Sequence, residues 1–198
     1  DVIVIGAGHA GVEAALVNAR MGNRTLMVTF SYDTIGQMSC NPAIGGVGKG
    51  QLVKEIDALG GEMGLAADRT GIHFRRLNAS KGQAVRSSRC QSDRKRYRLY
   101  MQDVVRRQEN LDVLEDEVQE LIVENGQASG IKARKAGEIR STAVVITTGT
   151  FLKGRIHRGK EIIPGGRIGE PNSVRLAESL ENLGFEIVDL KLKNIDKV

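Results

Sequence analysis

The sequence predicts an α/β fold in which a parallel sheet is combined with an antiparallel β-meander. The first observation is an apolar strand over residues 2–5 that leads through a glycine-rich turn into a helix and then into a second apolar strand over residues 26–28. The second is residues 111–148, where short alternating runs are separated by turn residues. The third is the apolar string "AVVITTG", which ends that stretch as a further strand.

The elements of the first fifty residues follow from local signals. Residues 2–5, "VIVI", are continuously apolar, as in a parallel strand that is buried on both faces. The helix is expected to begin near His9 and to stop at Gly22, because glycine is the usual residue just past a helix C-terminus. Residues 31–50 predict a loop.

The later elements include three helical stretches. Residues 50–68 return to helical spacing with one apolar face, although Gly60-Gly61 weakens the helix. Residues 91–108 predict a second stretch that is highly charged at its start. The last helix is expected to begin at Pro171 or Asn172 and to end near Gly184.

The composition is that of a globular protein with one sizeable core. The chain has 198 residues, of which 40% are apolar and 27% are charged. No apolar run approaches the roughly 18 residues that a membrane-spanning helix needs, so no membrane partner is expected. Two cysteines without a C-x-x-C pair argue against a disulfide scaffold and a metal site, and they indicate a reducing, cytoplasmic compartment.

Positive charge is concentrated in one part of the chain. Nine basic residues lie between Arg75 and Arg98, and Asp93 is the only acidic residue there. This distribution favours a polyanionic partner, and the alternatives are a solvated helix start, contact with the pyrophosphate of a cofactor and contact with a symmetry-related subunit. The absence of tryptophan argues against a base-stacking module. The candidate phosphate contacts are Arg86, Arg89, Arg94, Lys95, Arg96 and Arg98.

A glycine-rich loop with the pattern G-x-G-x-x-G connects the first strand to the first helix, at Gly6-Ala7-Gly8-His9-Ala10-Gly11. In such a loop Gly6 allows the sharp turn, Gly8 lets the backbone approach a pyrophosphate, and Gly11 lets helix and strand pack closely. The helix N-terminus adds free N–H groups and a partial positive charge. We interpret the loop as a dinucleotide cradle. A plain glycine turn is the alternative.

The loop departs from the full dinucleotide pattern at one point. An acidic residue normally ends the second strand and binds a ribose hydroxyl. This sequence has Thr29 or Phe30 at that place, and Asp33 comes a few residues late. Recognition of the ribose is therefore expected to use Thr29, the backbone or a residue elsewhere.

The choice between NAD and FAD depends on the later part of the chain. A plain Rossmann half would continue with alternating strands and helices, whereas here a meander leads to a strand that ends in Thr147-Thr148-Gly149. This arrangement resembles the second signature of the two-dinucleotide-binding flavoproteins, in which a Thr-Gly pair, here Thr148 and Gly149, lies near the flavin. The resemblance implies FAD and a Rossmann-like FAD-binding domain.

Three long strings carry a more specific resemblance: "DTIGQMSCNPAIGGVGKGQLVKEIDALGGEMG", "LNASKGQAVRSSRCQSDRKRY" and "TTGTFLKGRIHRG". They resemble the glucose-inhibited division protein A family, over residues 1 to about 190. Members are the FAD-containing large subunits of the tRNA uridine 5-carboxymethylaminomethyl modification enzyme. Transferred by motif, the resemblance implies a phosphate loop at residues 6–11, further FAD contacts at Val118 and Ser173, and a functional cysteine at Cys40.

The family resemblance implies a reaction on tRNA. Reduced flavin helps to transfer a one-carbon unit from methylenetetrahydrofolate to carbon 5 of the wobble uridine, and NADH reduces the flavin. Glycine or ammonium supplies the amine, a GTPase subunit completes a heterotetramer, and the flavoprotein is expected to be a homodimer. The alternatives are a folate-dependent tRNA uridine-5-methyltransferase flavoprotein, a generic FAD-dependent oxidoreductase of small molecules, and a non-catalytic fragment.

The resemblance also implies that the chain is one portion of a longer protein. Family members are some three times longer and contain an inserted NADH-binding domain and a helical C-terminal region. Residues 1–198 are therefore expected to be the N-terminal part of the FAD-binding domain, incomplete at its C-terminal end and inactive alone. The final string "LKLKNIDKV" departs from the family pattern.

Cys40 has two possible roles. It precedes "NPAIGGVGKG", whose glycines would let the backbone approach a flavin ring closely. In that setting a thiol could act as a nucleophile or assist proton movement, provided that nearby positive charge lowers its pKa. The alternative is a buried, inert cysteine beside a structural turn.

Overall fold

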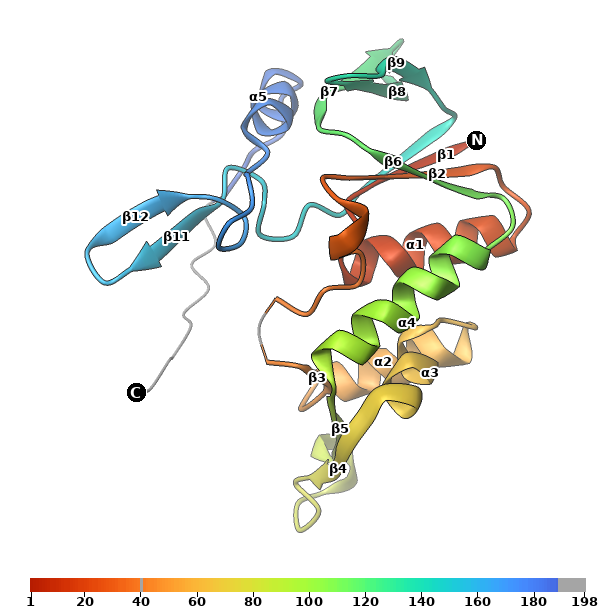
Figure 1. The fold of residues 1–198 in the computed structure, drawn as a ribbon, viewed down its shortest axis with the longest axis vertical. Helices are drawn as coiled ribbons and strands as arrows, with labels where there is room; N and C mark the ends of the chain where they lie inside the picture. Colours follow the sequence, from red (N-terminus) through yellow and green to blue (C-terminus); the bar gives the residue numbers. More distant parts are fainter. Residues whose placement is uncertain (40, 189–198) are drawn as a thin grey trace.

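A four-stranded parallel sheet lies at the centre of the protein (Figure 1). The computed structural model describes residues 1–39 and 41–188. The strand order is β10-β1-β2-β6, and all three neighbouring pairs are parallel. The predicted α/β fold with a parallel sheet is therefore confirmed. The four strands are β1 (Val2–Ile5), β2 (Thr25–Thr29), β6 (Leu111–Glu115) and β10 (Ala143–Ile146).

Both faces of this sheet are covered, which explains the unbroken apolar run of β1. Val2 and Val4 pack into one core together with helices α1 (His9–Arg20) and α4 (Arg94–Arg107). Ile3 and Ile5 point into a second core on the opposite face, which the meander and α5 (Val174–Asn182) complete. Figure 1 shows α1 and α4 on one side of the sheet and β7, β8 and β9 on the other.

The antiparallel meander is shorter than the sequence predicts. It consists of β7 (Val118–Glu124), β8 (Gln127–Ala133) and β9 (Gly137–Arg140). The flanking strands β6 and β10 belong instead to the parallel sheet, so their assignment to the meander was wrong. Both occupy the edges of that sheet and are only partly buried. The mixed sequence of β6, "LDVLE", is also typical of an antiparallel strand, whereas β10, "AVVI", is apolar throughout and carries no signal that separates it from the meander.

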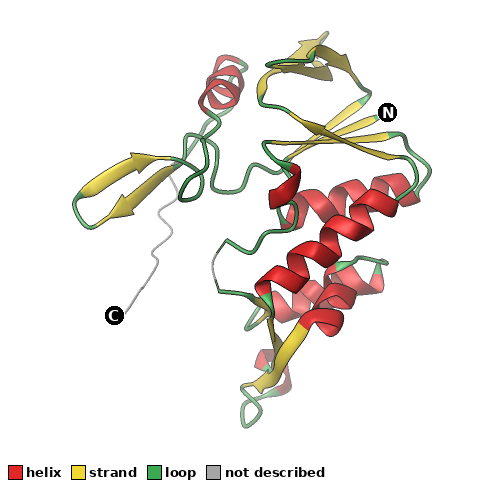
Figure 2. Cartoon of the chain, viewed as in Figure 1, coloured by secondary structure: helices red, strands yellow, loops and turns green. Residues whose placement is uncertain are grey.

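A second layer lies beyond α4 at the far end of the molecule (Figure 2). The predicted helix over residues 50–68 is divided into α2 (Lys49–Ala58) and α3 (Met63–Thr70), with Gly60 at φ 83° in the break. These helices pack on a three-stranded antiparallel sheet in the order β3-β5-β4, which the sequence did not predict. Its strands are β3 (Ala43–Gly45), β4 (Gly71–Leu77) and β5 (Ser87–Ser92), and residues 32–34 form a short 3-10 turn.

The C-terminal part consists of a hairpin and the last helix. Strands β11 (Arg155–Arg158) and β12 (Glu161–Pro164) form an antiparallel pair that projects from the body (Figure 1). The hairpin was not predicted, because most of its residues are exposed and show no apolar period. Helix α5 lies within the predicted limits. Among the helices of the described residues, none is long and apolar enough to cross a membrane.

Candidate cofactor-binding site

A cleft opens at the carboxyl ends of the parallel strands. From β1 the chain passes through α1 to β2, which pairs with one edge of β1. Strand β10 pairs with the other edge of β1. Such a point, where the connections diverge, is where open α/β sheets bind ligands. The cleft encloses about 240 Å³. Its lining comes from the ends of all four strands, from residues 34–39 and from the segment before α5.

The glycine-rich loop follows β1 directly into this cleft. Gly6 has φ 101°, and a Cβ atom there would lie 2.5 Å from the carbonyl oxygen of Thr147. A Cβ on Gly11 would overlap the carbonyl of Gly6. Only glycine therefore permits the turn at position 6 and the close approach of helix to turn at position 11. Both roles that the sequence predicts for these glycines agree with the geometry.

Gly8 differs from Gly6 and Gly11 because the position that a side chain would occupy there is open space. A Cβ atom there would have no heavy atom within 4 Å, although Gly8 itself lines the cleft. It is the N-cap residue of α1, and no side chain caps the helix there. The first helical bond runs from the N–H of Val12 to the carbonyl of Gly8. The preceding N–H groups thus have no acceptor within the helix, which suits them to an anion.

Eight of the ten predicted cofactor contacts line the cleft. Val118 at the start of β7 and Ser173 before α5 both reach it, and the N–H of Ser173 is fixed by a 2.8 Å bond to the carbonyl of Phe151. Ala10 and Gly11 are in the loop but do not line the cleft. The eight that do are Gly6, Ala7, Gly8, His9, Val118, Thr148, Gly149 and Ser173.

The end of β2 carries no carboxylate, as the sequence indicates, but it does carry an aromatic wall. Thr29 and Phe30 both line the cleft, and the ring of Phe30 lies 5.9 Å from that of Phe151 between centroids. Asp116, which follows β6, is an acidic residue that also lines the cleft. Its oxygens, however, accept hydrogen bonds from the backbone N–H groups of residues 117, 135 and 136. Although burial opposes ionisation, these donors lower the pKa of Asp116.

His9 lies on the cleft next to the aromatic ring of Tyr97. The two rings meet edge to face with centroids 5.6 Å apart. Burial, and secondarily the positive charge of Arg167, lowers the pKa of His9 below its ordinary value. The lower pKa favours the neutral imidazole, so His9 itself contributes little positive charge beside the helix N-terminus.

Sequence reasoning missed Arg167. It lies in the loop between β12 and α5 and lines the cleft with its partner Glu170. The guanidinium also stacks on Phe151 at 5.4 Å from the ring centroid. Nothing local in the string "PGGRIGEP" distinguishes this arginine from a surface residue, because its contacts are with segments far away in the sequence.

Cys40, the predicted catalytic residue, lies outside the described residues. Its neighbour Ser39 lines the cleft, as does Gln37. The string that carries the cysteine therefore reaches the candidate cofactor site. Among residues 1–39 and 41–188, no group of three His, Cys, Asp or Glu side chains is placed to hold a metal ion.

The six predicted phosphate contacts are divided between the small sheet and α4. Arg86 and Arg89 belong to β5 and the segment before it, and Arg98 is half-buried in α4. The other three, Arg94, Lys95 and Arg96, form the exposed first turn of α4. Asp93 caps this helix by accepting a hydrogen bond from the N–H of Arg96. The basic surface lies on elements other than those that form the glycine-rich loop.

Comparison with known proteins identifies the family. The sequence model described as "Glucose inhibited division protein A" matches residues 1–192. The tRNA uridine 5-carboxymethylaminomethyl modification enzyme MnmG of Aquifex aeolicus is 55% identical over 191 residues. That match covers 96% of this chain but 31% of MnmG, so the chain spans about a third of the length of this relative.

Solved structures agree with the sequence match. The crystal structure of Aquifex aeolicus GidA has a TM-score of 0.90 at 56% identity, covering 94% of this chain and 31% of that one. The GidA-related protein from Thermus thermophilus has a TM-score of 0.64 at 19% identity, covering 94% and 69% respectively, which shows a shared fold. The resemblance drawn from the sequence motifs is confirmed: the chain belongs to the glucose inhibited division protein A family.

Proposed function

We propose that this chain is the FAD-binding part of an enzyme that modifies carbon 5 of the wobble uridine in tRNA. The observation that carries the proposal is the uncapped N-terminus of α1, which opens into a cleft whose glycine-rich loop tolerates no larger residue at positions 6 and 11. The printed activity of the Aquifex relative supplies the substrate class. The chain is expected to act within a longer protein rather than alone.

The residues of the cleft fit FAD. The N–H groups of Gly8 and His9, which line the cleft, would hold the diphosphate, because they lack acceptors within α1 and lie at its positive end. Val118 and Ser173 would contact the rest of the dinucleotide from the opposite wall, and Thr148-Gly149 would lie near the flavin. When it is bound, FAD supplies the electron-transfer chemistry, and the residues of this chain bind and orient it.

Uncompensated positive charge supports tRNA as the partner. Several arginines of the described residues lie within 4.0 Å of a carboxylate, among them Arg20, Arg24, Arg106, Arg107, Arg134, Arg140 and Arg167. By contrast, Arg75 on β4 lies directly opposite Arg89 on β5, and the structure gives neither a carboxylate partner within the described residues. Like charges in that position repel, and the phosphates of a nucleic acid would relieve the repulsion.

The finer parts of the proposal come from the family resemblance. They are reduction of FAD by NADH, methylenetetrahydrofolate as the one-carbon donor, a GTPase subunit in a heterotetramer, a homodimer and a cytoplasmic location. Cys40 is the proposed catalytic thiol. Residues 1–198 are proposed to be the N-terminal part of one FAD-binding domain, with the NADH-binding domain supplied by other parts of the protein.

The proposal predicts that the complete protein is purified with bound FAD. Its absorbance spectrum should show the visible flavin bands, and denaturation should release FAD at close to one equivalent per chain. Added NADH should bleach those bands. A protein that neither contains FAD nor binds it on addition would contradict the cofactor assignment.

Replacing Arg94, Lys95 and Arg96 by alanine is expected to weaken tRNA binding. At low salt the affinity should fall by at least about tenfold, and the slope of log K against log salt should shrink by about 2, because roughly three phosphate contacts are lost. Filter binding at several salt concentrations measures both quantities.

A matched control is Arg106→Ala with Arg107→Ala at the other end of the same helix. Asp103 pairs with both arginines at 2.6 and 3.1 Å and offsets part of their charge, so tRNA affinity should fall much less than in the triple variant. Equal losses in the two sets of variants would show that net charge alone decides binding. No loss in either set would remove the first turn of α4 from the tRNA surface.

A further inference from the structure

Arg167 and Glu170 form an ion pair in the lining of the cleft, which we call the clamp. The Nη2 atom of Arg167 donates a hydrogen bond to Oε2 of Glu170 at 2.8 Å, and Nε lies 2.7 Å from Oε1 without hydrogen-bond geometry, so the ion pair contains one hydrogen bond. The side chains of both residues are largely buried, with 16% and 18% of their surface exposed. A largely buried ion pair with a charge-assisted hydrogen bond restricts where the guanidinium can lie.

The remaining nitrogen of this guanidinium holds a distant segment. Nη1 donates to the carbonyl of Gln37 at 3.3 Å and to the hydroxyl of Ser39 at 3.2 Å, about 130 residues away in the sequence. The planar face of the guanidinium lies over the ring of Phe151. One side chain therefore connects three segments of the cleft lining: residues 37–39, the segment after β10 and the loop before α5.

The clamp also carries charge into the cleft. Arg167 and Glu170 both line it, one positive and one negative. The positive charge acts as far as the phosphate loop, since it contributes to the lowered pKa of His9. Charges beside a flavin change its redox properties, because reduction places negative charge on the ring system.

We propose that Arg167 is a positioning residue that fixes the wall of the cofactor cleft and, together with Glu170, sets the electrostatic field at the bound flavin. The inference rests on the proposed binding of FAD in this cleft. It assigns two separable effects to the pair. The contacts of Arg167 contribute to the affinity for FAD. The positive charge of Arg167 raises the midpoint potential of the flavin, and the negative charge of Glu170 lowers it.

Two substitutions in the complete protein distinguish the effects. Arg167→Gln removes the positive charge and leaves Glu170 unpaired, so the midpoint potential of bound FAD should shift to more negative values. Glu170→Gln leaves the positive charge unpaired, so the potential should shift to more positive values. Both variants lose the ion pair between Arg167 and Glu170, and each should bind FAD about tenfold more weakly. Fluorescence titration of the apoprotein and reductive titration with a reference dye measure the two quantities.

Two further variants separate charge from folding. Arg167→Lys keeps the positive charge but loses the planar guanidinium group. The midpoint potential of its bound FAD should therefore stay near that of the unaltered protein, while its affinity for FAD falls. Arg158→Gln makes the same chemical change on the exposed strand β11, outside the cleft, and should alter neither quantity.

Potential shifts of the same sign in Arg167→Gln and Glu170→Gln would reduce the pair to a merely structural role and overturn the electrostatic part of the inference. Unchanged affinity and potential in both variants would overturn all of it while the proposed function stood. An unaltered protein without flavin would instead contradict the proposed function together with this inference.

Discussion

Replacing Gly8 by aspartate is expected to abolish cofactor binding while leaving the fold intact. The new side chain has room, because a Cβ at Gly8 meets no heavy atom within 4 Å. The backbone there, with φ −72°, suits any residue. Aspartate is also a better N-cap than glycine, by a few tenths of a kcal/mol. The free energy of unfolding should therefore be unchanged or slightly raised.

Two effects would weaken FAD binding in this variant: repulsion between the aspartate and the diphosphate, and competition between them for the backbone N–H donors. The aspartate would occupy the N–H groups that the diphosphate needs. It would also place two like charges close together, which costs about 4 kcal/mol at 4 Å and an effective dielectric constant of about 20. FAD affinity should fall by at least about 100-fold. Flavin content after purification and titration of the apoprotein with FAD measure this loss.

Two other variants make the interpretation specific. Gly82→Asp introduces the same charge at an equally open glycine with negative φ, outside the cleft, and FAD binding should be retained. Gly8→Ala adds only a methyl group and should weaken binding far less than Gly8→Asp. If Gly8→Asp kept its full flavin content, the diphosphate would not lie at the N-terminus of α1, and the proposed cofactor site would be wrong.

The sequence predicted the conformation of the glycine-rich loop because the requirements of this loop are local. The positions of Gly6 and Gly11 depend on a turn and a helix that are adjacent in the chain, so a short pattern is sufficient to identify them. The same holds for Thr148-Gly149, which directly follows a strand. Each of these residues lies on the cleft or against it.

The prediction failed where non-local pairing decides the structure. Strand β6 alternates because it is an edge strand of the parallel sheet, and this pattern does not distinguish it from a strand of the meander. Strand β4 is exposed along most of its length and therefore has no apolar signal. Arg167 acquires its role from contacts about 130 residues away, and no local pattern contains that information.

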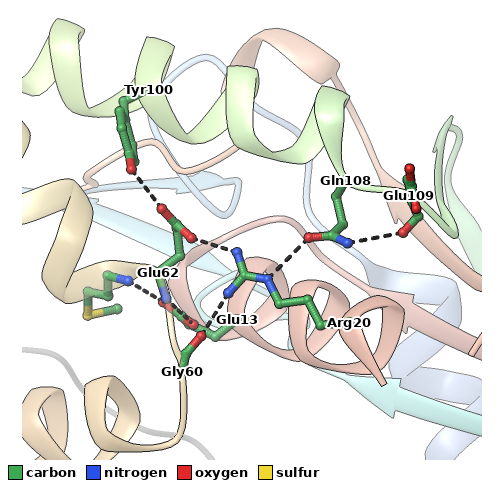
Figure 3. A network of polar contacts seen from close by, with 8 residues as sticks. Glu13, Arg20, Gly60, Glu62, Tyr100, Gln108 and Glu109 are labelled. Atoms are coloured by element: carbon green, nitrogen blue, oxygen red, sulfur yellow. Dashed lines mark hydrogen bonds and ion pairs between the residues drawn. The ribbon is translucent and has the colours of Figure 1, made fainter. Parts of the chain in front are cut away.

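A partly buried polar network connects α1, the helix that follows the glycine-rich loop, to the second layer (Figure 3). Glu13 on α1 accepts the backbone N–H groups of Glu62 and Met63, so it caps α3 from a neighbouring helix. The Glu62 carboxylate in turn accepts hydrogen bonds from Arg20 at 2.6 Å and from the Tyr100 hydroxyl at 2.7 Å. Arg20 also holds the carbonyl of Gly60, in the break between α2 and α3.

Tyr100 makes this network sensitive to alkali. Burial, together with the hydrogen bond to Glu62 and its negative charge, raises the pKa of Tyr100 to about 12. The protonated hydroxyl therefore contributes stability that is fully present below pH 10 and is lost as the pH rises through about 12. The variant Tyr100→Phe should lose stability at neutral pH, and the gap between it and the unaltered protein should narrow between pH 10 and 12.

Glu62→Ala is expected to be the most destabilising single substitution in this network. Glu62 is 5% exposed, and its removal leaves the Arg20 guanidinium and the Tyr100 hydroxyl without their shared acceptor. Loss of one partner of a buried ion pair costs about 3–5 kcal/mol, and because Arg20 remains 34% exposed we expect about 2–4 kcal/mol here.

Chemical denaturation, followed by circular dichroism, measures the free energy of unfolding of these variants. The control Glu120→Ala removes an exposed partner of Lys132 and should cost less than about 1 kcal/mol. Because Glu13 and Arg20 are both on α1, the loss of Glu62 should also loosen the attachment of the second layer to the helix that starts at the phosphate loop. Equal costs for Glu62→Ala and Glu120→Ala would show that the network contributes no more than a surface ion pair, and that apolar packing alone holds the two layers together.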